Sequence, residues 1–124
     1  MCLIVSKSIQ IAAEDIVCYK AVTKDLHSPC YGFEYQIEKL TPKVVMQELG
    51  GRVTTGYHTY KNKEDIDLRV LWNAKNNLET PYMRASIILE CIIPKGTAYY
   101  EGYNNDFRTS PGYCSNQLLI KQII

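Results

Sequence analysis

The chain lacks a charge excess and a long apolar run. Its 14 Lys and Arg residues against 13 Asp and Glu residues give a net charge of +1, so no strong field favours duplex nucleic acid through phosphate neutralisation. No apolar run approaches the roughly 18 residues of a membrane-spanning helix. The opening M-C-L-I-V is too short for a signal-peptide core and follows no basic residues. We therefore expect a cytoplasmic protein without a membrane partner.

The chain also lacks a dense or paired set of cysteines. It has five, an odd number, at wide spacings and without a C-x-x-C pair, which argues against a secreted disulfide framework and against a zinc site. We expect free thiols in a reducing compartment. Removal of Met1 would make Cys2 an N-terminal nucleophile, but no His or Asp pattern accompanies it.

The common catalytic signatures are missing as well. The sequence contains no phosphate-binding glycine loop, no H-E-x-x-H pair, no calcium loop and no nucleophile elbow. It predicts no metal, no cofactor and no catalytic residue.

What the chain does have is the composition of one ordinary domain, residues 1–124, with 46% hydrophobic and 22% charged residues. Ten tyrosines stand against two phenylalanines and one tryptophan. Tyrosine is favoured at half-buried strand positions and also at binding surfaces, because its ring is apolar and its hydroxyl is polar. Both interpretations remain open.

Most of the chain has strand-like patterns. Residues 33–38 (F-E-Y-Q-I-E) alternate apolar and polar side chains, as in a half-buried strand. Runs rich in β-branched and aromatic residues, bounded by Gly, Pro or Asn, predict the other strands. These runs lie at residues 3–5, 15–22, 52–60, 83–93, 98–103 and 117–124.

One helix is predicted, over residues 63–75. Asn62 is a candidate N-cap, and Glu64 and Asp65 would complement the helix dipole in the first turn. Residues 43–49 follow a Thr-Pro pair and suit a short helix or a strand, with the helix favoured. The predicted fold is α+β and β-rich: a single, mostly antiparallel, twisted sheet of about six or seven strands with one main helix.

The first candidate ligand-binding segment is G-Y-H-T-Y, residues 56–60. Tyr57 and Tyr60 could stack on a base while His58 hydrogen-bonds hydroxyl groups of a ligand. The alternative is a core histidine bonded to the backbone.

Two further segments contribute candidates. Residues 93–102 would place Lys95, Tyr99 and Glu101 at a pocket wall, or else form a plain hairpin around Pro-Lys-Gly. Asn116 opens the last strand and is either a ligand contact or part of a turn. Lys20 interrupts an apolar strand, where it either faces solvent or needs a buried partner.

Six segments carry distinctive motifs: M-C-L-I (1–4), E-D-I-V-C-Y-K (14–20), S-P-C-Y-x-F-x-Y (28–35), G-Y-H-T-Y (56–60), C-I-I-P-K-G-T-A-Y-Y-E-G (91–102) and S-N-Q-L-L-I (115–120). These motifs resemble those of a family of small uncharacterised proteins of gut bacteria and their phages, and the resemblance covers most of the chain. The resemblance implies no activity, because none is established for the family.

Three functions follow as hypotheses. The favoured one is a non-catalytic binding module that captures a nucleotide-like small molecule or a host protein, in the manner of a phage-type host-defence antagonist. The second is an NAD- or nucleotide-using enzyme that resembles ADP-ribosyltransferases of the His-Tyr-Glu type. That resemblance implies roles for His58, for Tyr99 or Tyr100, and for Glu101. The third is a structural protein that forms a homo-oligomer.

Overall fold

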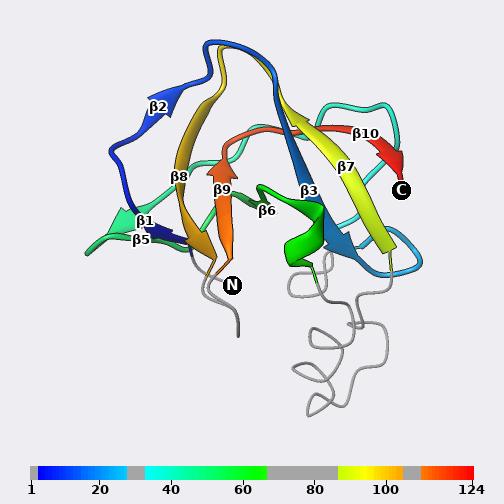
Figure 1. The fold of residues 1–124 in the computed structure, drawn as a ribbon. Coiled ribbons are helices and arrows are strands. Elements are labelled where there is room, and N and C mark those ends of the chain that lie inside the picture. The colour runs from blue at the N-terminus through cyan, green and yellow to red at the C-terminus, as the bar shows by residue number, and fades with distance from the viewer. Residues whose placement is uncertain (1–2, 28–32, 67–86, 105–109) are drawn as a thin grey trace.

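The computed structural model describes residues 3–27, 33–66, 87–104 and 110–124. These residues form one sheet of ten strands in which every pairing is antiparallel (Figure 1). The strands are β1 (Leu3–Val5), β2 (Gln10–Ile11), β3 (Ile16–Val22), β4 (Glu48–Leu49), β5 (Arg52–Val53), β6 (Tyr57–Tyr60), β7 (Ile87–Ile93), β8 (Ala98–Asn104), β9 (Pro111–Ser115) and β10 (Leu119–Ile123).

The strand order across the sheet is β10-β7-β3-β6-β9-β8-β1-β5-β4, and β2 pairs with β8 off this path. In Figure 1 the strands β7 and β10 lie on one side of the molecule and β1 and β5 on the other. Neighbours in the sheet are mostly distant in sequence, so the fold depends on long-range pairing.

The predicted α+β class is wrong, because the described residues form an almost entirely β structure. In the described part of the helix predicted over 63–75, only a single 3-10 turn forms, η1 (Lys63–Asp65), and Ile66 is already extended. Asn62 does not cap the helix, since its side chain donates to the Asp65 carboxylate at 3.2 Å. Residues 67–75 lie outside the described residues.

The predicted count of six or seven strands is also wrong. The two-residue strands β2, β4 and β5 carry no periodicity that a sequence could display, and β9 begins with a proline and a glycine. In place of the helix favoured over 43–49, Glu48–Leu49 forms β4 against β5. The predicted strands around β1, β3, β6, β7, β8 and β10 are confirmed, and residues 83–86 of the strand predicted over 83–93 lie outside the described residues.

Residues 33–38 are not a strand of the sheet, although their alternation is real. Glu38 adopts a positive φ of 63°, which ends any extended run. The side chains of Phe33, Tyr35 and Ile37 nevertheless pack into the core. This segment therefore covers the sheet instead of joining it.

The two faces of the sheet are defined by pairs of residues that lie directly opposite each other, because such partners point to the same side. Thr59, Tyr113 and Glu101 form one cross-strand row, on what we name the Tyr113 face. His58 and Cys114 belong to the next row, on the Cys114 face.

Each face has a core. The Tyr113 face carries the largest cluster, covered by residues 33–44; it includes Cys18, Tyr35, Tyr57, Leu89, Cys91, Ile93, Tyr113, Leu118 and Ile120. The Cys114 face has two smaller clusters, one of Leu3, Val53 and Cys114 and the other of Ala21, Tyr60 and Ile66.

Candidate functional site

His58 is a buried core histidine. Its Nε2 lies 3.0 Å from the Val53 carbonyl oxygen, so the ring nitrogen donates to that carbonyl. Burial lowers the pKa of His58 to about 4, the hydrogen bond to Val53 opposes this shift, and the charge of Lys20 adds to it. The imidazole is therefore neutral near pH 7, and its Nε2 is already hydrogen-bonded to the protein's own backbone.

Tyr57 and Tyr60 are buried on opposite faces of β6. The Tyr57 hydroxyl donates to the Pro42 carbonyl at 2.7 Å, and its ring packs edge-on against Phe33 with centroids 5.8 Å apart. Tyr60 packs with Ile66 in one of the clusters of the Cys114 face. Both rings stabilise cores. For these two tyrosines the structure therefore supports packing on strands, not a binding surface.

Lys20 lies on the Tyr113 face and is half-buried. Its ammonium group donates to the His58 carbonyl at 2.7 Å and lies 5.6 Å from the centroid of the Tyr35 ring. Burial lowers the pKa of Lys20, but the electrostatic interaction and the hydrogen bond with the Tyr35 hydroxyl oppose this, and the pKa is raised overall. Lys20 is therefore a charged group held inside the fold by a carbonyl and an aromatic ring.

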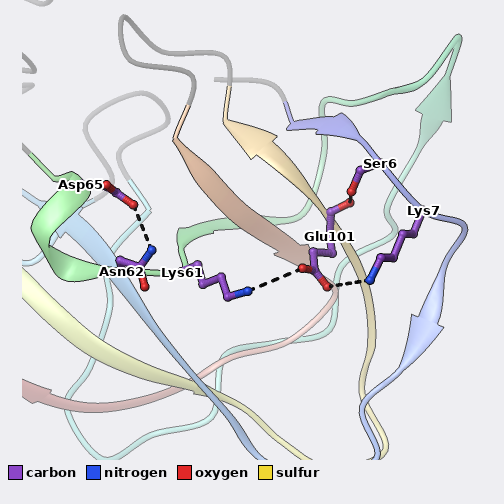
Figure 2. A network of polar contacts seen from close by, with 6 residues as sticks. All are labelled: Ser6, Lys7, Lys61, Asn62, Asp65 and Glu101. Atoms are coloured by element: carbon purple, nitrogen blue, oxygen red, sulfur yellow. Dashed lines mark hydrogen bonds and ion pairs between the residues drawn. The ribbon is translucent and has the colours of Figure 1, made fainter.

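Glu101 lies at the centre of a surface network (Figure 2). Its carboxylate is 3.9 Å from the ammonium groups of both Lys7 and Lys61, and Ser6 donates its hydroxyl to the Glu101 carbonyl at 3.1 Å. We name Lys7, Lys61 and Glu101 the Glu101 cluster. Burial raises the pKa of the neighbouring Tyr113 to about 12, and the charge of Glu101 contributes. The cluster carries two cations for one carboxylate.

Tyr99 is the second predicted site residue near this cluster. It lies two residues before Glu101 in β8, so both side chains point to the Tyr113 face. The Tyr99 ring packs edge-on against Tyr113 with centroids 5.8 Å apart. The structure therefore brings Tyr99 and Glu101 to one face.

Lys95 and Asn116 do not join them. Lys95 lies in the exposed turn between β7 and β8, where its backbone N–H donates to the Asp15 carboxylate at 2.8 Å. The Asn116 carbonyl accepts from the Val44 N–H at 2.9 Å, so this residue fastens the covering segment to the sheet.

The register separates His58 from Glu101. His58 pairs with Cys114, which pairs with Tyr100, whereas Glu101 pairs with Tyr113. His58 and Glu101 thus lie on opposite faces of the same sheet. The roles that the ribosyltransferase resemblance implies for these two side chains require one common pocket, which this register does not provide.

The described thiols are free and buried: Cys18, Cys91 and Cys114. Burial raises the pKa of Cys18 and of Cys114 to about 12 and that of Cys91 further still. They are packing groups rather than thiolates near neutral pH. Within residues 3–27, 33–66, 87–104 and 110–124, no group of three His, Cys, Asp or Glu side chains is placed to hold a metal ion.

A second feature on the Tyr113 face was not predicted. Tyr103, Ile4, Arg52 and Leu49 are successive cross-strand partners on β8, β1, β5 and β4. We name them the open row, because Tyr103 is 47% exposed, Ile4 37% and Leu49 71%, and Arg52 is exposed. The sequence shows that Tyr103 follows Glu101 on the same strand face, but only the pairing of β8, β1, β5 and β4 aligns the four residues.

Comparison with protein-family models, with curated proteins and with solved structures found no match. In the part of the chain that the structure describes, no helix has the length and apolar character needed to cross a membrane.

Proposed function

We propose that the protein is a non-catalytic binding module of the cytoplasm that captures a nucleotide-like ligand at the Glu101 cluster. The observation that carries the proposal is that the exposed ammonium groups of Lys7 and Lys61 converge on one carboxylate. This arrangement leaves positive charge uncompensated beside the half-exposed ring of Tyr103, two residues along the strand from Glu101.

The ion pairs of the Glu101 cluster are weak enough for a ligand to replace the carboxylate as partner of the lysines. Lys7 and Lys61 have side chains that are 59% and 49% exposed, and each lies at 3.9 Å, the long end of the ion-pair range. Such surface pairs contribute about 0–1 kcal/mol each. A phosphate carries more charge and more acceptor oxygens than one carboxylate, so it competes for the same lysines.

The test is isothermal titration calorimetry with AMP, cyclic nucleotides and NAD, at low salt. Lys7→Gln and Lys61→Gln should each weaken binding several-fold, and Glu101→Gln should tighten it, because the internal competitor is removed. Lys24→Gln is the matched control, since Lys24 is exposed in the turn that follows β3. Absence of heat with every ligand, or equal binding by all four variants, contradicts the proposal.

The biological role that we attach to this binding is antagonism of a host defence, through a nucleotide signal or a host protein. It is supported only by the motif resemblance to proteins of gut bacteria and their phages. Expression in a bacterial host that carries a nucleotide-signalling defence should restore phage growth, and the Lys7→Gln, Lys61→Gln double variant should not.

Self-association is a second candidate function, favoured by one observation. β4 ends the sheet, and Leu49 on it is 71% exposed, as is Val45 nearby at 83%. Exposed apolar edges pair with other strands. Light scattering should then give a dimer mass that Leu49→Lys converts to a monomer mass; a monomer at high concentration removes this candidate.

A further inference from the structure

We infer that the open row is a binding surface for single-stranded nucleic acid, with the Glu101 cluster at one end. The inference rests on the proposed function and names its ligand class: an oligonucleotide that extends beyond a single nucleotide. Tyr103 connects the two features, because it lies beside Glu101 on β8 and begins the open row.

The length of the surface suits several nucleotides. Neighbouring strands are separated by about 4.8 Å, so the four residues of the open row span roughly 15 Å across β8, β1, β5 and β4. A single strand that keeps a stacking distance of roughly 3.4 Å would place about four nucleotides over that length. A mononucleotide would leave Arg52 and Leu49 uncovered.

The residue types match the two parts of a nucleic-acid strand. The ring of Tyr103 is available for base stacking, and the apolar side chains of Ile4 and Leu49 can contact further base or sugar surfaces. Among the described residues, the Arg52 guanidinium has no hydrogen bond or ion pair, which leaves its donors available to phosphate.

The charge of this surface favours a polyanion over a protein strand. The open row supplies one cation, Arg52, and the Glu101 cluster supplies two, Lys7 and Lys61. Glu101 is the one carboxylate among the residues of the open row and the Glu101 cluster. The chain as a whole is nearly neutral, at +1, so the positive charge is local. An exposed row with one stacking ring suits unpaired bases, whose faces are accessible, better than a duplex, whose bases are stacked inside.

The test is fluorescence anisotropy of labelled dT12 and rU12 over a series of salt concentrations. Three phosphate contacts predict a slope of about −2 for log K against log salt concentration, since each contact contributes about −0.7 with single strands. Arg52→Gln should reduce that slope by about 0.7. Tyr103→Ala should weaken binding by about tenfold or more, while Tyr103→Phe should retain it.

The controls separate the inference from the proposal on which it rests. The Lys24→Gln variant checks for non-specific charge effects. Circular dichroism spectra of every variant check for misfolding. If AMP binds in calorimetry but dT12 and rU12 bind no more tightly, the inference fails and the proposed function stands. If oligonucleotides bind and Arg52→Gln and Tyr103→Ala have no effect, the open row is refuted as their surface. If neither class of ligand binds, both fail.

A protein partner would give a different pattern. Light scattering that shows a dimer disrupted by Leu49→Lys, with no anisotropy change for either oligonucleotide, would assign the open row to self-association and overturn the inference.

Discussion

The buried imidazole of His58 predicts that acid destabilises the protein through this one residue. Above pH 6.5 the ring is neutral in both the folded and the unfolded state. As the pH falls from 6.5 towards 4, the unfolded state binds a proton and the folded state does not, because burial lowers the folded pKa to about 4. Stability that is present above pH 6.5 is therefore lost as the pH falls, and the loss levels off below the folded pKa.

The magnitude follows from the difference between the two pKa values. With an unfolded pKa of about 6.5 and 1.36 kcal/mol for each pKa unit, His58 accounts for a loss of about 2 kcal/mol between pH 7.5 and pH 5, and about 3 kcal/mol once its titration is complete. This is a large part of the stability of a small domain.

The assay is urea unfolding at pH 7.5 and pH 5, for the wild type and for His58→Gln. The glutamine amide can still donate to the Val53 carbonyl but cannot titrate, and every other titratable group is common to both proteins. Between pH 7.5 and pH 5, the free energy of unfolding should fall by about 2 kcal/mol more in the wild type than in the variant. Equal losses in both proteins would show that His58 is not the source of the acid sensitivity. An NMR titration that places the His58 pKa near 6.5 would show the same, and that result does not depend on the variant folding.

The remaining predictions concern packing and the surface. Tyr57→Phe should lower the free energy of unfolding by about 1–2 kcal/mol in urea melts, because the Pro42 carbonyl loses its 2.7 Å donor in a part-buried position; an unchanged midpoint would contradict this. Gly102→Ala should unfold or strongly destabilise the protein in thermal melts, because an added Cβ would overlap the Ile4 backbone carbonyl across the β1–β8 pairing. Glu101→Gln should change the same melts by less than about 1 kcal/mol, since its two 3.9 Å ion pairs involve exposed lysines; a larger loss would show that the cluster is structural.

Part of the candidate site follows from the sequence. The alternation of a strand is enough to put the predicted site residues Tyr99 and Glu101 on one face. Tyr57 and His58 are also predicted site residues, but their polar atoms are hydrogen-bonded to the carbonyl groups of Pro42 and Val53. Those backbone partners lie 15 and 5 residues away, and only the folded chain brings their carbonyls within reach.

No sequence pattern marks Lys7, Lys61, Arg52 and Tyr103 as a group. Lys7 and Lys61 come together because β1, β8, β9 and β6 are neighbours in the sheet. Isolated exposed cations look the same in a sequence whether they surround a common anion or face solvent separately.

Local sequence patterns predict where most long strands run, that Pro94 to Gly96 turns between two of them, and that the described cysteines are free thiols. Those features depend on neighbouring residues: β-branched content, turn chemistry and spacing. Only the folded chain shows that residues 33–38 cover the sheet and which face each side chain occupies relative to distant strands. These outcomes depend on long-range pairing, where a shift of one residue would move His58 to the face of Glu101.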